Sequence, residues 1–215
     1  MAEKTIKSVA RKTVKPEKAR GRPKGSNAEH VILSGAWKAF AVHGYHDCSV
    51  ANILEYSGSS RTNFYRFFKN KEEVFESILK SNIEVLDKFL SIAFKEAKKT
   101  TDIREKFEII NQCYINTCFA AGDILPVLFQ EQHTLPEHKV MREKLFNKIQ
   151  KGIEAMIKDA GQEVPDPLLI QALMAGVDRI ILQLSMKRIS VDSKKAKASE
   201  LISQFYDPIC EHLLS

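Results

Sequence analysis

Apolar residues along this 215-residue chain recur every three or four positions, the spacing that places them on one face of an α-helix. A long example comprises Val74, Phe75, Ile78, Leu79, Leu86, Phe89, Leu90 and Ala93. No segment alternates apolar and polar residues for long enough to indicate a β-strand. The pattern predicts an all-α fold with nine helices, at about 28–43, 49–56, 60–67, 71–98, 102–120, 123–131, 135–160, 166–188 and 193–213.

Residues that start and stop helices divide this helical material. An oxygen-bearing side chain stands three positions before a glutamate, the arrangement of a capping box, at Asn70–Glu73, Asp102–Glu105 and Thr134–Glu137. Asp166 followed by Pro167 predicts another helix start, and Gly44, Gly122 and Gly161 predict helix ends. The helices are short before Asn70 and long after it, which predicts one helical domain at 28–75 and a larger one at 76–215.

The net charge of +6 is concentrated at the amino terminus. Residues 1–27 contain nine Lys or Arg and two Glu, a net of +7, so the rest of the chain has a net of −1. With almost no large apolar residues, this basic arm is expected to be disordered when free and to contact a polyanion. It lacks the amphipathic face of a membrane-binding helix, so nucleic acid is the favoured partner and no membrane partner is expected.

One segment of the arm has a more specific pattern, Arg20-Gly21-Arg22-Pro23-Lys24. It resembles the AT-hook, a short extended element whose arginines enter a narrow A·T-rich minor groove. A nonspecific basic tail fits the same residues equally well, because both would use the same electrostatic attraction to phosphates. Arg20, Arg22 and Lys24 are DNA-contact candidates under either interpretation.

Several classes of protein are disfavoured. The cysteines, Cys48, Cys113, Cys118 and Cys210, form no CxxC pair, which favours reduced thiols in a cytoplasmic protein without a secretory signal. His43, His46 and Cys48 lie close together but lack a fourth ligand at a recognised spacing, so no metal site is expected. Without a GxSxG, HExxH, Glu-x-x-His or phosphate-cradling glycine motif, an enzyme is the least favoured class, and no catalytic residue or cofactor is expected.

Residues 28–75 have the pattern of a helix-turn-helix. Ser49 is a good N-cap for a short helix, and Ser57-Gly58-Ser59 can form a tight turn in which the glycine takes a positive φ. Ser60 caps the next short helix, Arg61-Thr62-Asn63-Phe64-Tyr65-Arg66-Phe67-Phe68. A glycine-containing turn between two short helices is typical of the helix-turn-helix unit, whose second helix enters the DNA major groove.

The spacing of these positions carries a family resemblance. The stretch Ala36…Phe40-Ala41…Gly44-Tyr45…Ser49-Val50…Ile53…Ser57-Gly58-Ser59-Ser60-Arg61…Phe64-Tyr65…Phe68-Lys69-Asn70-Lys71-Glu72-Glu73 resembles the DNA-binding domain of TetR-family transcriptional regulators. The chain departs from the family pattern at Ser57, Ser59, Thr62, Asn63 and Phe67, and Phe67 cannot hydrogen-bond to a phosphate. The resemblance implies a regulator, most commonly a repressor, that binds a near-palindromic operator as a homodimer and responds to a small molecule bound in its carboxy-terminal domain.

The helix-turn-helix supplies the expected DNA contacts. Arg61, Thr62 and Asn63 begin the recognition helix, where arginine suits guanine, asparagine suits adenine and the threonine methyl suits thymine. Tyr65 and Lys71 are similar to phosphate-contacting positions of the family. The remaining DNA-binding candidates on these helices are Ser49, Ser60 and Arg66.

The resemblance also implies an effector cavity in the carboxy-terminal domain. Its expected lining includes Tyr114, Thr117, Cys118, Phe129, His133, Met141, Met174 and Asp178, although each of these residues also fits an ordinary core. Asp178 interrupts an apolar run, and a buried carboxylate needs either a cationic ligand group or a basic side chain from another helix. An architectural DNA-binding protein that uses the basic arm without an effector remains the alternative function.

The last two predicted helices carry long apolar stripes. These are Leu169, Leu173, Ile180 and Leu184 on the first, and Leu201, Ile202, Phe205, Ile209 and Leu213 on the second. Ala175 and Gly176 would let another helix approach closely. The stripes suit a two-fold four-helix interface between protomers, and they equally suit the core of their own domain.

Overall fold

A computed structural model describes residues 25–131 and 136–214, and no strand occurs among them. The helices are α2 (Gly25–Asp47), α3 (Val50–Ser57), α4 (Arg61–Phe67), α5 (Lys71–Ala97), α6 (Ile103–Ala120), the 3-10 turn η1 (Gly122–Ile124), α7 (Leu125–Glu131), α8 (Pro136–Asp159), α9 (Pro167–Ser185) and α10 (Val191–Leu214). The predicted all-α class is confirmed. Each predicted helix that lies within the described residues occurs within a few positions of its predicted bounds.

Local capping explains most of these bounds. The side chain of Asn70 accepts a hydrogen bond from the Glu73 N–H (2.9 Å), and that of Asp166 accepts one from Leu168 (2.7 Å) ahead of the first turn containing Pro167. At Asp102 the capping box is not formed as predicted, because its carboxylate accepts from the Arg104 N–H instead. Thr134 lies outside the described residues.

The glycines end helices as predicted at two of three positions. Gly122 and Gly161 have φ of 67° and 75°, the left-handed region that favours glycine. Gly44 (φ 73°) instead interrupts α2, which begins at Gly25 and resumes for three residues beyond the kink. The prediction that the first helix ends at 43 is therefore correct for the regular part of α2 only.

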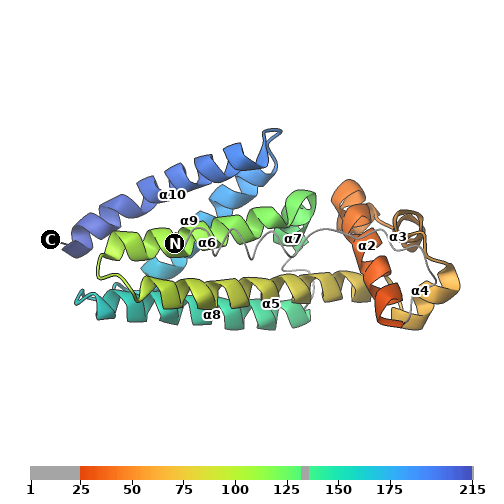
Figure 1. Cartoon of the computed structure of the whole chain (residues 1–215), viewed down its shortest axis with the longest axis horizontal. Coiled ribbons are helices and arrows are strands. Elements are labelled where there is room, and N and C mark those ends of the chain that lie inside the picture. The colour runs from red at the N-terminus through yellow and green to blue at the C-terminus, as the bar shows by residue number, and fades with distance from the viewer. Residues whose placement is uncertain (1–24, 132–135, 215) are drawn as a thin grey trace.

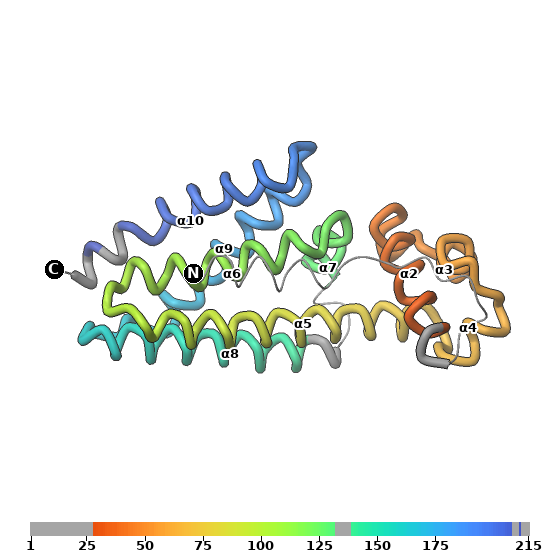
Figure 2. The backbone as a smooth tube through the Cα atoms, in the orientation of Figure 1, coloured from red at the N-terminus to blue at the C-terminus, as the bar shows by residue number. Residues whose placement is uncertain are grey.

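The molecule is elongated, with α2 and the short helices α3 and α4 gathered at one end (Figure 1). The long helix α5 leaves that end and runs beside α8 through the rest of the molecule (Figures 1 and 2). Helix α6 lies between α5 and α10, and α9 passes behind α6 (Figure 1). Because α5 continues unbroken from one part into the other, the predicted boundary at 75/76 falls within a helix.

Two hydrophobic cores divide the chain. The first contains α2, α3 and α4 together with the start of α5, up to Leu79, and it also includes Ile124, Val127 and Leu128 from η1 and α7. The second begins on α5 at Leu90 and joins α6, α8, α9 and α10. The short helix α7 thus packs into the core of the helix-turn-helix although it comes later in the sequence.

Helix α9 is the one helix among the described residues that is long and apolar enough to cross a membrane, judged by length and composition. Core helices of globular proteins meet the same criterion, and α9 contributes Ile170, Leu173 and Ile181 to the second core. Only about a third of its most apolar window is buried within the chain, 33%. A partly apolar face of α9 therefore remains uncovered in the single protomer.

Candidate DNA-binding surface and ligand cavity

The helix-turn-helix is held in shape by its caps. Ser49 and Asn52 exchange hydrogen bonds, with the Ser49 hydroxyl accepting from the Asn52 N–H (3.2 Å) and the Asn52 side chain accepting from the Ser49 N–H (2.9 Å). Gly58 adopts the predicted left-handed conformation (φ 65°) and donates to the Leu54 carbonyl. Ser60 then caps α4 by accepting from the Asn63 N–H (3.2 Å). These local bonds fix where α4 begins and how it leaves the turn.

Helix α4 has one buried and one exposed face. Phe64 and Phe68 are buried in the first core. Most of the predicted DNA-contact side chains are exposed, namely Ser49, Ser60, Arg61, Thr62, Tyr65 and Arg66, while Asn63 is half-buried. Tyr65 is 52% exposed. The arrangement leaves a polar helix face free to enter a groove.

Phe67 has a different role from a phosphate contact. The guanidinium carbon of Arg66 lies 4.6 Å from the centre of the Phe67 ring, within the range of a cation–π interaction. Phe67 thus supports the Arg66 side chain beside the exposed face of α4.

The contacts of Lys71 differ from the phosphate contact that the sequence predicts. Its ammonium donates hydrogen bonds to three backbone carbonyls, those of Tyr45, His46 and Cys48, each at 2.8 Å. An ammonium has three N–H donors, so all of them are used within the protein. The side chain joins the start of α5 to the segment between α2 and α3, and the predicted phosphate contact from Nζ does not fit this geometry.

A further contact in this domain, between Gly35 and Ser57, was also missed by the sequence analysis. A side chain at Gly35 would place its Cβ 2.4–2.5 Å from the backbone and Cβ of Ser57, so α2 and α3 pack at a distance that only glycine permits. The glycine occurs inside an apolar helical pattern without a neighbouring stop signal, and nothing nearby in the sequence indicates its contact. The arm residues Arg20, Arg22 and Lys24 lie outside the described residues.

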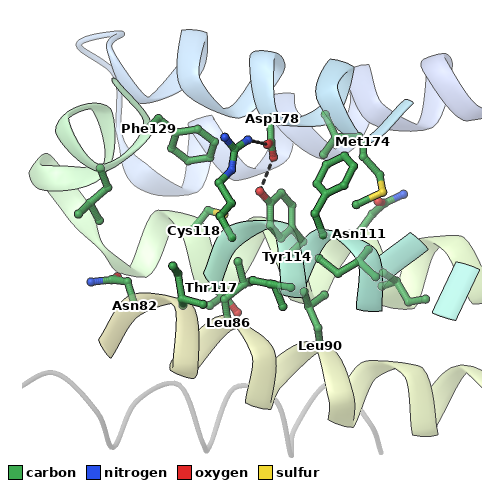
Figure 3. Close-up of a pocket in the computed structure, with 18 of the residues that line it drawn as sticks. Asn82, Leu86, Leu90, Asn111, Tyr114, Thr117, Cys118, Phe129, Met174 and Asp178 are labelled. Atoms are coloured by element: carbon green, nitrogen blue, oxygen red, sulfur yellow. Dashed lines mark hydrogen bonds and ion pairs between the residues drawn. The ribbon is translucent and has the colours of Figure 1, made fainter. Parts of the chain in front are cut away.

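A cavity of about 170 Å³ lies between α5, α6, α7, α8 and α9, and Tyr206 of α10 also lines it. Six predicted residues line it: Tyr114, Thr117, Cys118, Phe129, Met174 and Asp178 (Figure 3). Met141 does not line the cavity. Adjacent helix positions are about 100° apart, and it is the next residue, Arg142, that faces inward. His133 lies outside the described residues.

Most of the cavity lining is apolar, and its charged groups meet at one place. The Tyr114 hydroxyl, from α6, donates a short hydrogen bond to Oδ1 of Asp178 on α9 (Figure 3). Nη2 of Arg142, from α8, lies 3.5 Å from Oδ2 of the same carboxylate. The basic side chain from another helix that Asp178 was expected to need is therefore Arg142. The sequence analysis missed Arg142 because nothing local distinguishes it from the other charged residues of α8.

Burial controls the ionisation of this group. It raises the pKa of the Asp178 carboxyl, an effect that the Tyr114 hydrogen bond and the Arg142 charge oppose. Burial also raises the pKa of Tyr114 well above its ordinary value, with the Asp178 charge adding to the effect. The pKa of Cys118 rises for the same two reasons, so its thiol stays protonated near neutral pH.

The cavity and the helix-turn-helix share α7. Leu128 lines the cavity and also belongs to the first core, whose other α7 member is Val127. Glu131, at the end of α7, lies 3.2 Å from the imidazole of His46 in the last turn of α2. A displacement of α7 would therefore change both the shape of the cavity and the packing of the first core.

No group of three His, Cys, Asp or Glu side chains arranged to hold a metal ion occurs within the described residues. The histidines near Cys48 have other contacts: His43 packs edge-on against Tyr56, and His46 pairs with Glu131. The Cys48 thiol is buried and donates to the Ser49 carbonyl.

Comparisons with known proteins agree with this architecture. The family model for bacterial regulatory proteins of the tetR family matches residues 32–78. The HTH-type transcriptional repressor ComR of Escherichia coli (strain K12) is 32% identical over 108 residues, which are 49% of this chain and 51% of ComR. The chain thus matches about half the length of this curated relative.

Solved structures share the fold over a greater length. The fatty acid degradation regulator FadR from Bacillus halodurans superposes with a TM-score of 0.62 at 19% identity, covering 86% of this chain and 97% of that one. FadR from Bacillus subtilis in complex with stearoyl-CoA superposes with a TM-score of 0.57 at 16% identity, covering 81% and 97%. At these identities the likeness concerns the fold alone. The family match and the helix-turn-helix motif make residues 32–78 a DNA-binding domain of the tetR family, whose members are transcriptional regulators and not enzymes.

Proposed function

We propose that the protein is a ligand-responsive repressor, which binds a near-palindromic operator as a homodimer and is released by a small molecule in the cavity. The observation that carries the proposal is the double role of Leu128, which lines the cavity and packs in the core that holds the recognition helix. A ligand that displaces α7 changes the packing under α2, and hence the position of α4 relative to DNA. A protein that binds chromosomal DNA acts in the bacterial cytoplasm, where we expect this one.

The proposed base-reading residues are Arg61, Thr62 and Asn63 in the first turn of α4. Arg61 and Thr62 are exposed and can reach base edges, with arginine paired to guanine O6 and N7. Asn63 is only half-buried, which leaves its amide available to adenine. Ser49, Ser60, Tyr65 and Arg66 are proposed phosphate contacts, which fix the docking position without reading sequence. The arm would add contacts through Arg20, Arg22 and Lys24.

Dimerisation is proposed through α9 and α10. Leu168, Leu169 and Phe205 are large apolar side chains with 72%, 45% and 41% of their surface exposed in the single protomer. Leu173, Leu184 and Ile202 of the predicted stripes are buried in the protomer's own core instead. A second copy of this face would cover the exposed members in a four-helix arrangement. Two recognition helices would then need half-sites about one helical turn apart, roughly 34–36 Å.

Gly176 has a role inside the protomer rather than at the proposed interface. A Cβ at this position would lie 2.7 Å from the ring of Phe205, so the glycine lets α10 approach α9 of the same chain. The neighbouring Ala175 is exposed and remains on the proposed dimer face.

The test is binding to DNA that flanks the protein's own gene, measured by fluorescence anisotropy with and without small molecules. Alanine at Arg61 or Asn63 should cost ~1–3 kcal/mol on the cognate site and relax base preference at one position. Lys88→Ala, an exposed basic residue on α5 far from α4, is the matched control and should leave binding unchanged. Unchanged affinity and base preference in both α4 variants would reject the reading surface.

Deletion of residues 1–27 tests the arm and the architectural alternative together. The deletion should lower affinity on all DNA and reduce the salt dependence, because fewer counterions are released. A larger loss on A·T-rich than on G·C-rich flanks would support minor-groove entry by Arg20 and Arg22, and an equal loss would leave a nonspecific tail. A deleted protein that has lost all preference for the operator would favour an architectural protein that uses the arm alone.

A further inference from the structure

The charged groups of the cavity give its ligand a definite chemistry. Asp178 presents one carboxylate between two helices that each supply one partner, Tyr114 on Oδ1 and Arg142 on Oδ2. Asp178 and Arg142 both line the cavity, and 22% and 28% of their side chains are exposed. The pair is therefore accessible to a molecule inside the cavity. Around it the lining is largely apolar, so a ligand must also be mainly apolar.

The two partners of Asp178 are held unequally. The Tyr114 hydroxyl donates a hydrogen bond to Oδ1. The Arg142 contact, at 3.5 Å, is longer than the ~2.7–2.9 Å of a well-formed charge-assisted hydrogen bond. Arg142 also has a further interaction within the chain. Arg142 is thus the partner that a ligand can replace.

A cationic ligand that replaces Arg142 beside Asp178 and an anionic ligand that pairs with Arg142 have different consequences. A ligand cation that takes the place of Arg142 leaves the carboxylate with both an opposite charge and the Tyr114 hydrogen bond. An anion that pairs with Arg142 instead brings a second negative group beside Asp178 and leaves that carboxylate without its cation. A buried charge that loses its partner is strongly destabilising, and burial already disfavours the ionised form of Asp178.

Aromatic rings near the Asp178 carboxylate also favour a cationic ligand over an anionic one. Phe129, Tyr114 and Phe146 line the cavity. Figure 3 shows Phe129 and Tyr114 at the same end of the cavity as Asp178. The faces of aromatic rings attract cations, particularly those that are poorly hydrated, such as alkylammonium groups. A carboxylate with aromatic neighbours in an apolar cavity is suited to a lipophilic cation.

We infer that the effector is an apolar molecule carrying one cationic group, which displaces Arg142 from Asp178. This inference rests on the proposed function, because it assigns a ligand class to the same cavity. It differs from an acyl ligand, the class bound by the Bacillus subtilis neighbour crystallised with stearoyl-CoA, in the sign of the charge at the head group.

The experiment compares three probes with the same ten-carbon chain: decyltrimethylammonium, decanol and decanoate, each below its critical micelle concentration. Dissociation constants are measured by calorimetry for the full chain and for Asp178→Asn and Arg142→Gln. Asp159→Asn and Arg179→Gln are the matched controls, because both residues are exposed and neither lines the cavity. Decanol binding by each variant shows that the cavity is still formed.

The wild-type protein should bind the ammonium probe at least about 10-fold more tightly than decanol, roughly the worth of one desolvated charge pair. Asp178→Asn should remove this preference while decanol binding changes by less than about 3-fold. Arg142→Gln should tighten ammonium binding, because it removes the internal competitor for the carboxylate. The control variants should behave as the wild type. Arg142→Gln retains Asp178, so the proposal stays testable if Asp178→Asn fails to fold.

Three results would overturn the inference. Tightest binding of decanoate, lost in Arg142→Gln, would assign an anionic ligand to the cavity. Equal binding of all three probes, unchanged in Asp178→Asn, would reject the head-group site and leave a purely apolar cavity. Binding of none of the probes would count against the cavity as a ligand site, and so against the proposed function itself.

Discussion

Replacing Lys71 with methionine separates a structural role from a DNA contact. Methionine keeps an unbranched apolar stem and removes the ammonium, together with its bonds to the carbonyls of Tyr45, His46 and Cys48. The ammonium also lies 5.0 Å from the centre of the Tyr45 ring. These carbonyls belong to the end of α2 and the connection to α3, where they have no helical N–H to pair with. The variant should therefore loosen the joint between α2, α3 and α5.

The size of the effect follows from the three bonds. A hydrogen bond to a charged group contributes about 1.5–3 kcal/mol. The three bonds share one charge at a half-buried position, and water can replace part of each, so their sum is an overestimate. We expect a loss of about 2–4 kcal/mol in the free energy of unfolding. For a chain of this length that corresponds to a fall of roughly 5–15 °C in Tm.

Thermal unfolding followed by circular dichroism measures the change in stability. DNA binding as a function of salt concentration tests whether Lys71 contacts a phosphate. Lys69→Met is the matched control, since Lys69 is exposed and its side chain has no bond to the segment after α2. At a temperature where Lys71→Met is folded, its salt dependence should equal that of the wild type, because no phosphate contact is lost. A variant with unchanged Tm, weaker DNA binding and a smaller salt slope would refute the structural role and restore the phosphate contact.

Two further predictions concern packing and thiol chemistry. Gly35→Ala should lower the free energy of unfolding by ~1–3 kcal/mol, because the added Cβ clashes with Ser57. Helix propensity alone would leave Tm unchanged or raise it, and that result would contradict the close packing. Burial raises the pKa of Cys48 and Cys113 to about 11, so at pH 8 both thiols should stay protonated and resist iodoacetamide until the protein is unfolded, with modification followed by mass spectrometry of peptides. Rapid labelling of the native protein would contradict this prediction, because it would show that the thiols are accessible. These pKa values lie above the unfolded value of 9.0, so between pH 9 and 11 the folded state binds more protons than the unfolded state. The free energy of unfolding should therefore fall as the pH rises from about 9 to 11.

Local signals made the helices predictable. The caps at Ser49, Ser60 and Asn70 each bond within three residues of their own position, so the residues that form the bond are visible together in the sequence. The positive φ of Gly58 likewise belongs to one residue. Asp102 shows the limit of this reasoning, because two backbone donors lie within its reach and the sequence does not determine which one it takes.

The contacts that were not predicted join residues far apart in the chain. The Lys71 ammonium reaches carbonyls 23 to 26 positions earlier, and Arg142 lies 36 positions from Asp178. The existence of a partner for Asp178 could be deduced from the cost of burying a charge. Its identity could not, because it depends on how α8 is rotated against α9. The same rotation decides that Arg142, and not Met141, faces the cavity.

The two cores are joined by elements of unequal stiffness, and this determines how a ligand can act. Helix α5 passes through both cores as 27 continuous residues, so a displacement of α5 would move parts of both cores together. Helix α7 has only seven residues, with Leu128 lining the cavity and also packing in the helix-turn-helix core. A ligand alters DNA affinity only through a difference in its own affinity for the two conformations, and couplings of ~1–3 kcal/mol are typical. A side-chain-sized displacement of α7 is sufficient for such a difference, because close-packed cores repack between discrete arrangements rather than deform continuously. We therefore propose that the effector acts by displacing α7, which packs between the cavity and α2, and that this displacement changes the position of the recognition helix α4.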